Sequence, residues 1–219
     1  MHETVQKLLQ IEKVVKSKKD EFNIKELPKI IAVTKTFKKE IFQSLIDFGH
    51  KDFGENKVQE AVEKWTIIKE KKSEIKLHLI GKLQTNKVKL AIKIFDYIHS
   101  LDSKKLAKKI SDEQFKQGKK IKIFIQVNIG EENQKSGINK SELNDLLDYC
   151  KKLELDIIGL MCLPPADIDP NPFFKEIYKI KINLNLKELS MGMSNDYLEA
   201  VKFKATYIRV GSKIFGSRT

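Results

Sequence analysis

Strand-like and helix-like segments alternate along almost the whole chain, and this alternation constrains the fold more than any other feature. The first strand-like run spans 29–35, is continuously apolar over Ile30-Ile31-Ala32-Val33, and is followed by a helical stretch over 38–48. Further strands are expected at 50–55, 77–81, 97–101, 120–129, 156–163, 188–191 and 205–211, with helices at 57–71, 86–95, 103–117, 140–153, 171–183 and 195–203. Strands separated by helices pair in parallel. Eight such units predict a closed (β/α)8 barrel of the TIM type, and an open doubly wound sheet is the alternative.

One more helix is expected ahead of the first strand. Residues 2–20 place Val5, Leu8, Leu9 and Ile11 at helical spacing. A length of 219 residues suits one domain, and no repeat, low-complexity tract or linker divides the chain. We therefore predict a single α/β barrel domain over 1–219 with an extra N-terminal helix.

Composition indicates a soluble cytoplasmic protein. The chain is 41% hydrophobic and 33% charged, contains no long apolar run, and begins with a polar segment unlike a secretory signal. Cys150 and Cys162 are too few for a disulfide framework or a metal cluster, which suits a reducing cytosol. No metal or membrane partner is therefore expected.

The net charge of +12 raises nucleic acid as a possible partner. The lysines are spread along the chain, however, and aromatic residues are not interleaved with them as in single-strand binders. Nucleic-acid binding is therefore a secondary hypothesis, which a gel shift that survives physiological salt would support.

Two glycine-centred segments near the end of the chain predict a phosphate site. They are 189–194 (Leu-Ser-Met-Gly-Met-Ser) and 209–212 (Arg-Val-Gly-Ser), and Arg209 and Arg218 are the only arginines among 42 basic residues. Serine hydroxyls and close-approach backbone N–H groups hold phosphates, and arginine offers a rigid fork of donors that lysine lacks. In a barrel, phosphate sites are often built by the loops after strands seven and eight, where these segments fall. The alternative is that two arginines remain by chance in a lysine-rich chain.

Lys35 closes the first strand and is expected to project into the same mouth. Partial burial favours a neutral lysine amine, which attacks an aldehyde to give a Schiff base. The alternative is that one of many lysines follows a strand by chance. A lysine, a phosphate cradle and an arginine facing a pyridine nitrogen together describe a site for pyridoxal 5'-phosphate (PLP). Because a guanidinium disfavours a protonated pyridine, such a site holds the cofactor more readily than it drives carbanion chemistry.

At this point the chain resembles the pyridoxal phosphate homeostasis proteins, which are related to the N-terminal barrel of alanine racemase. The motifs occur in family order and cover nearly the whole chain: Ala32-Val33-Thr34-Lys35-Thr36, Phe53-Gly54-Glu55-Asn56, His78-Leu79-Ile80-Gly81, Leu83-Gln84-Thr85-Asn86-Lys87, Gln126-Val127-Asn128, Lys135-Ser136-Gly137, Gly159-Leu160-Met161, 189–194 and 209–218. The resemblance implies the PLP fold type III and a protein that binds PLP for intracellular homeostasis.

The resemblance also implies roles for individual residues. Lys35 carries PLP as an internal aldimine, Arg209 approaches the pyridine nitrogen, and the phosphate is surrounded by Ser190, Gly192, Ser194, Gly211 and Ser212. Asn56, His78 and Met161 are candidates to line the pocket. The alternatives are a helix cap for Asn56, a core histidine for His78 and a packing residue for Met161. Lys135 suits either cofactor traffic or a solvated loop, and Arg218 is not expected to be catalytic. Phe37 stands where many family members have a second lysine.

Two functions compete for this site. The first is a PLP-binding protein without an established reaction, which delivers the cofactor to PLP-dependent apo-enzymes as a monomer or weak dimer. The second is an amino-acid racemase, whose relatives take a tyrosine acid/base from an added β-domain. The chain ends at Thr219, so we expect that domain to be absent, and none of its five tyrosines falls in an evident mouth loop. We therefore predict PLP binding rather than catalysis.

Overall fold

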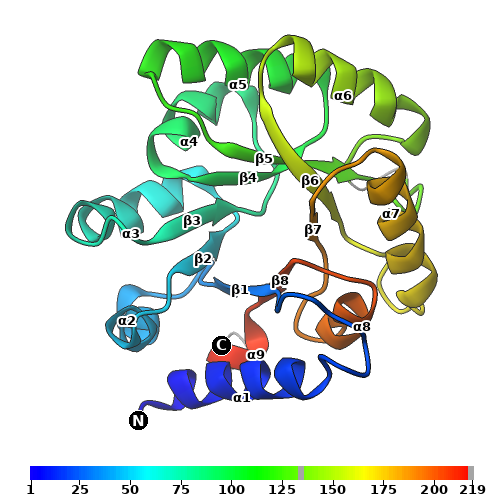
Figure 1. Cartoon of the computed structure of the whole chain (residues 1–219). Coiled ribbons are helices and arrows are strands. Elements are labelled where there is room, and N and C mark those ends of the chain that lie inside the picture. The colour runs from blue at the N-terminus through cyan, green and yellow to red at the C-terminus, as the bar shows by residue number, and fades with distance from the viewer. Residues whose placement is uncertain (133–135, 217–219) are drawn as a thin grey trace.

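The computed structural model describes residues 1–132 and 136–216 and shows a closed parallel barrel (Figure 1). Neighbouring strands pair in chain order, and β8 pairs with β1 to close the sheet. The strands are β1 (Lys29–Val33), β2 (Asp52–Glu55), β3 (Lys76–Leu79), β4 (Tyr97–Leu101), β5 (Lys122–Val127), β6 (Asp156–Cys162), β7 (Glu188–Ser190) and β8 (Tyr207–Val210). The predicted (β/α)8 barrel is confirmed, and the open-sheet alternative is wrong.

Helices follow the strands and surround the barrel. They are α2 (Lys39–Phe48), α3 (Val58–Lys71), α4 (Val88–Ile94), α5 (Lys104–Gln117), α6 (Leu143–Lys152), α7 (Asn171–Asn183) and α8 (Tyr197–Lys202). The predicted helices at 86–95 and 140–153 each open with a 3-10 turn, η1 (Thr85–Lys87) and η2 (Lys140–Glu142). A short helix after β8, α9 (Ser212–Phe215), was not predicted. Among the described helices, none has both the length and the apolar character needed to cross a bilayer.

The predicted extra helix, α1 (Glu3–Ser17), completes the outer ring. It packs against α2 and α9, so it lies where the barrel would otherwise place a full helix after β8 (Figure 1). Val5, Leu8, Ile11 and Val15 form its buried face. Because α9 has only four residues, α1 supplies the apolar cover that the junction of β8 and β1 requires.

The barrel has two separate packed regions. The larger one lies between the strands and the helices and includes Phe42, Phe53 and Trp65, whose rings contact one another. The smaller one fills the barrel interior with Ile31, Tyr97, Phe124, Met161 and Tyr207. Polar residues share this interior and are also buried: His78, His99, Ser190 and Arg209. A polar interior is costly unless every group is hydrogen-bonded, so its contacts bear on function.

Candidate functional site

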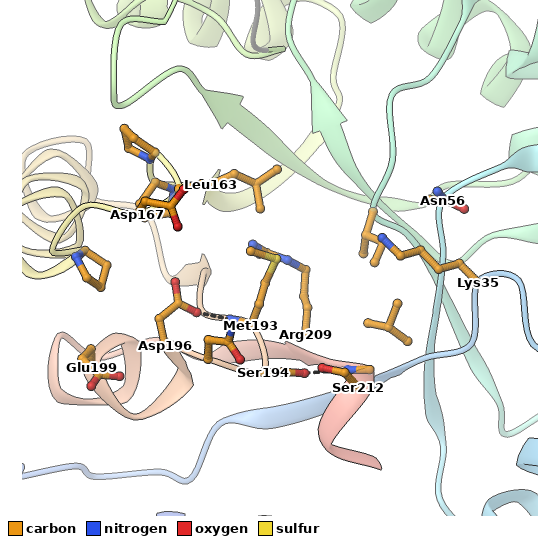
Figure 2. Close-up of a pocket in the computed structure, with 18 of the residues that line it drawn as sticks. Lys35, Asn56, Leu163, Asp167, Met193, Ser194, Asp196, Glu199, Arg209 and Ser212 are labelled. Carbon is orange, nitrogen blue, oxygen red and sulfur yellow. Dashed lines mark hydrogen bonds between the residues drawn. The ribbon is translucent and has the colours of Figure 1, made fainter. Parts of the chain in front are cut away.

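A cavity of about 1070 Å³ opens at the carboxyl ends of the strands. Its walls come from the loops after β1, β2, β3, β6, β7 and β8, and they include Lys35, Phe37, Asn56, Gly81, Pro165, Ser194, Arg209 and Ser212. Figure 2 shows Lys35 entering from one side, close to Asn56, with Arg209 between Lys35 and an acidic wall in this view. The carboxyl ends of the strands are where barrel proteins build their active sites.

Six of the ten predicted site residues line this cavity: Lys35, Asn56, Ser194, Arg209, Gly211 and Ser212. These residues come from the loops after β1, β2 and β7, from β8 and from the segment that follows β8, so the fold gathers segments that are far apart in sequence. The other four, His78, Met161, Ser190 and Gly192, are not among the described residues that line it.

Lys64 of α3 forms hydrogen bonds with the backbone of the loop that carries Lys35. Lys64 Nζ donates to the carbonyl oxygens of Thr34 (2.8 Å) and Phe37 (3.1 Å), one on each side of Lys35. The same ammonium lies 2.8 Å from Glu55 Oε1 and 2.8 Å from Glu60 Oε1. These contacts fix the backbone from which the half-buried Lys35 side chain enters the cavity.

Glu55 anchors the same assembly and is fully buried. Its Oε1 accepts from Thr34 Oγ1 (2.7 Å) and from Trp65 Nε1 (3.0 Å), besides its contact with Lys64. Burial raises the pKa of Glu55, although the hydrogen bond from Lys64 opposes that shift. The carboxylate therefore depends on its cationic partner to remain charged inside the protein.

Asn56 brings an unsatisfied polar atom to the cavity. Its Oδ1 is buried and has no hydrogen-bond partner within the described part of the chain. Gly81 packs against it so closely that a Cβ at Gly81 would lie 2.3 Å from the Asn56 carbonyl oxygen. A buried amide oxygen without a donor is rare in folded proteins, and here it belongs to a residue that lines the cavity.

Arg209 is a buried cation, 3% exposed, that faces the cavity. Its Nη1 donates to Ser190 Oγ (2.7 Å) and its Nη2 to the Cys162 carbonyl oxygen (3.0 Å). Burial lowers its pKa, yet an arginine in a protein remains charged. Two neutral acceptors therefore hold the guanidinium in one orientation.

The loops after β7 and β8 converge on the Ser194 hydroxyl. Ser194 Oγ accepts from the backbone N–H groups of Gly211 (3.3 Å) and Lys213 (3.4 Å). Both contacts are longer than the usual N–H···O range. The loops thus present hydroxyl and backbone donors to one small region of the cavity, at the start of α9.

Gly192 shapes the first of these loops, and its replacement should distort the loop. Its φ is +87°, and an added Cβ would lie 2.5 Å from Ala200 Cβ. We expect Gly192→Ala to destabilise the protein by about 2 kcal/mol or more, the sum of left-handed strain and overpacking. Urea denaturation would measure the loss. Gly49→Ala is the matched control, because Gly49 has a φ of +95° with nothing within 4 Å of the added Cβ. Equal losses in the two variants would contradict the overpacking argument.

Two predicted pocket residues lie in the barrel interior. His78 is fully buried within β3, where its ring stacks on Tyr97 at 4.2 Å between centroids. Met161 lies within β6, pairs in register with Ser190 and packs against the interior apolar residues. Neither residue is among the described residues that line the cavity; His78 lies within β3 and Met161 within β6. Their role as cofactor contacts stays a prediction.

Ser190 and Gly192, predicted around the phosphate, both contact Arg209. Ser190 Oγ accepts from the guanidinium and also lies 2.8 Å from His99 Nδ1. The Gly192 carbonyl oxygen accepts from the Arg209 backbone N–H at 2.9 Å. Lys135 and Arg218 fall outside the described residues.

The outer wall of the cavity is acidic, which the sequence analysis did not foresee. Asp167 and Asp169 come from the loop after β6, and Asp196 and Glu199 from the start of α8. Asp196 Oδ1 accepts from the Met193 backbone N–H and thereby closes its loop. Phe37, at the position of a second lysine in the family, also lines the cavity and packs against Phe215 at 5.2 Å between centroids.

Several supporting residues were missed because their contacts are tertiary. The Glu60–Lys64 spacing of four residues is visible in the sequence and indicates an ion pair on one helix face. No sequence signal, however, connects Lys64 to the loop that carries Lys35. Ser190 was predicted near the phosphate, but no sequence signal paired its hydroxyl or the Cys162 carbonyl oxygen with Arg209.

Three histidines, the buried His78 and His99 and the half-buried His50, predict a loss of stability in mild acid. Burial lowers the pKa of His50, His78 and His99. The unfolded chain takes up protons near the ordinary histidine pKa of about 6.5 while the folded rings stay neutral. The unfolded state then binds more protons, so the free energy of unfolding falls as pH is lowered through that value. Urea denaturation at pH 7.5, 6.5 and 5.5 should show a slope of up to about 1.4 kcal/mol per pH unit for each histidine. His50→Gln should reduce the slope without removing it, and a flat profile in the unaltered protein would contradict the argument.

The chain is similar to a known domain family and to named bacterial proteins. Residues 21–219 match the family model described as the alanine racemase N-terminal domain. The pyridoxal phosphate homeostasis protein of Aquifex aeolicus (strain VF5) is 36% identical over 200 residues, covering 87% of this chain and 87% of that protein. The protein of the same name from Escherichia coli (strain K12) is 33% identical over 199 residues, covering 86% and 85%.

Solved structures show the same likeness. PipY of Synechococcus elongatus PCC7942, solved with PLP bound, has a TM-score of 0.80 at 31% identity and covers 92% of this chain and 100% of that chain. The alanine racemase of Clostridium difficile 630 has a TM-score of 0.68 at 15% identity, covering 94% of this chain and 56% of that chain. The second likeness concerns the fold alone.

Proposed function

Because the chain belongs to the pyridoxal phosphate homeostasis proteins, a family that shares the alanine racemase N-terminal domain, we propose that it binds PLP in the cavity at the barrel mouth. One observation carries this proposal: Lys35, Arg209 and the Ser194–Gly211 donors all line one cavity. A primary amine, a cation and a set of phosphate-binding donors match the aldehyde, ring and phosphate of PLP.

The residues present fit the cofactor in two further respects. Asn56 lines the cavity, and its buried Oδ1 has no hydrogen-bond partner in the described residues, so a ligand donor that reached this oxygen would satisfy it. The N–H groups of Gly211 and Lys213 both donate to the Ser194 hydroxyl at long distances. A phosphate oxygen could therefore replace that hydroxyl as their acceptor with little loss of hydrogen-bond energy. Ser194, Gly211 and Ser212 would hold the phosphate.

Lys35 would hold the cofactor covalently. Its Nζ would supply the amine nitrogen that replaces the aldehyde oxygen of PLP, and that oxygen would leave as water. When bound, PLP supplies an aldehyde for this Schiff base and a pyridine ring that can accept electrons. The backbone contacts of Lys64 on each side of Lys35 pre-position the amine for that attack.

Arg209 would keep the ring a weak electron acceptor. Its fixed guanidinium disfavours a second positive charge on a pyridine nitrogen placed beside it. This arrangement supports retention of PLP over amino-acid chemistry and agrees with relatives named as homeostasis proteins.

Racemisation is less well supported. No tyrosine is among the described residues that line the cavity. Tyr97 and Tyr207 lie in the barrel interior, and burial raises the pKa of each to about 12. Amino-acid racemisation by the purified protein, lost in Lys35→Ala, would favour the enzyme instead.

The role in the cell follows as part of the same proposal. The protein would act in the cytoplasm as a monomer or weak dimer and deliver PLP to dependent apo-enzymes. The buried free thiols of Cys150 and Cys162 are compatible with a reducing compartment.

The experiment is direct. Purified protein mixed with PLP should develop the visible absorption band of a protein-bound Schiff base. Borohydride reduction followed by peptide mapping should then place the pyridoxyl group on Lys35. A protein that takes up no PLP would overturn the proposed function, whereas a label on another lysine would overturn only the role of Lys35.

A further inference from the structure

A continuous hydrogen-bonded chain of side chains crosses the barrel interior from one end toward the other. It begins at Asp52, the first residue of β2, whose Oδ1 lies 3.0 Å from His78 Nε2. His78 Nδ1 lies 3.0 Å from His99 Nε2, and His99 Nδ1 lies 2.8 Å from Ser190 Oγ. Ser190 Oγ in turn accepts from Arg209 Nη1 at 2.7 Å. The chain therefore joins the amino-terminal end of the strands to the cation at the mouth.

The chemistry of its two ends fixes the direction of every link. Arginine only donates, so Ser190 Oγ must accept from Arg209 and can give its own proton to His99 Nδ1. His99 then carries its proton on Nε2 and donates to His78 Nδ1, and His78 donates from Nε2 to Asp52. An ionised carboxylate only accepts, which suits the last link. In the reverse direction His99 Nδ1 and Arg209 Nη1 would both donate to Ser190 Oγ. The buried Ser190 hydroxyl hydrogen would then lose His99 Nδ1 as its acceptor, which is costly in a protein interior.

The surroundings favour neutral imidazoles between the two charged ends. His78 stacks on Tyr97 and His99 on Phe124, each at 4.2 Å between centroids. The titratable groups that face the two rings are Asp52, Asp96, Lys29, Tyr97, Tyr207 and Arg209. Desolvation lowers the pKa of both histidines, while the hydrogen bond from His78 lowers the pKa of Asp52 against its own burial.

We propose that His78, His99 and Ser190 form a one-way hydrogen-bond relay that orients Arg209 and couples it to Asp52 as a distant counter-charge. This inference rests on the proposed PLP site for its consequence, because Arg209 faces that site. Asp52 is then a positioning residue that influences the cofactor ring without touching it. Cooperative polarisation along such a chain strengthens each link in a low-dielectric interior.

The relay has a test in the protein without cofactor. Nitrogen-15 NMR of histidine-labelled protein should show His78 and His99 neutral at pH 7, each with its proton on Nε2. His78→Gln and His99→Gln would assign the signals. A proton on Nδ1 of either ring, or an imidazolium at pH 7, would overturn the relay. This measurement needs no bound PLP, so it is independent of the proposed function.

The coupling has a second test in the loaded protein. Asp52→Ala removes the final acceptor, and we expect His78 to populate both tautomers and the pH titration of the visible PLP band to move by about half a pH unit or more. Asp52→Asn keeps an acceptor oxygen and should retain the Nε2–H tautomers while losing the charge. Asp156→Asn is the matched control, since Asp156 also opens a strand but is exposed. Unchanged tautomers and an unchanged titration in Asp52→Ala would overturn the coupling. If that variant fails to fold, an unchanged titration in Asp52→Asn would overturn the role of Asp52 as a counter-charge.

Discussion

Replacing Lys35 with alanine is expected to abolish covalent retention of PLP. The variant lacks the amine that forms the Schiff base, so the visible band of the bound cofactor should be absent and borohydride should fix no pyridoxyl group. Reversible binding should persist at reduced affinity, because Ser194, Gly211 and Arg209 still line the cavity. Absorption spectra and intact mass after reduction would measure the loss, and equilibrium dialysis would measure the residual binding.

Lys38→Ala is the control for this variant. Lys38 is exposed and lies three residues further along the same loop, where it precedes the first residue of α2. It should retain the visible band and the borohydride label. A band that persists in Lys35→Ala and disappears in Lys38→Ala would transfer the covalent role to Lys38.

The parts of the site that were predicted share a physical reason. In a parallel barrel, the carboxyl end of every strand reaches the same face, so residues just after strands can be grouped from their positions alone. Lys35, Asn56 and Gly211 each follow a strand end closely and line the cavity. The same rule predicted His78 as a lining residue, but His78 lies within β3, which ends at Leu79, and it is not among the described residues that line the cavity.

The parts that were missed depend on contacts across the fold. Alternation of strands and helices predicted a closed barrel of eight parallel units, but an open sheet stayed an alternative because no local pattern reports the pairing of β8 with β1. The four residues of α9 are too few for a periodic signal. The interior hydrogen-bonded chain likewise joins residues of β2, β3, β4, β7 and β8. His78, Ser190 and Arg209 were candidate site residues, but no pattern in the sequence connects them to Asp52 and His99.

Replacing Lys64 with methionine is expected to give a large loss of stability. Glu55 is fully buried, and the Lys64 side chain is only 14% exposed. Removing one partner of a buried pair leaves the other charge uncompensated, which costs about 3–5 kcal/mol. The variant also releases the carbonyl oxygens of Thr34 and Phe37, so the loop that carries Lys35 should loosen and PLP binding should weaken. Urea denaturation and PLP titration would measure the two effects.

The stability that Lys64→Met loses should depend on pH, and the direction of this dependence should identify Glu55 as the unpaired group. Burial already raises the pKa of Glu55, and loss of Lys64 removes the opposing interaction and raises it further. The folded variant then holds a proton that the unfolded chain has released, so its free energy of unfolding should fall as pH rises from about 5 to 7. Adding Glu55→Gln should recover most of the stability, because a neutral amide oxygen still accepts from Thr34 and Trp65. Additive losses in the double variant would contradict the pairing.

Lys69→Met separates stability from cofactor binding. Lys69 lies on the same helix, pairs with Asp96 and donates to the Ile94 carbonyl oxygen at 3.0 Å. It is similarly buried, with 16% of its side chain exposed, but none of these partners belongs to the loop that carries Lys35. We expect this variant to lose stability yet bind PLP as the unaltered protein does. If both variants weakened PLP binding equally, general destabilisation would explain the effect; a loss confined to Lys64→Met would show that α3 holds the reactive lysine in place.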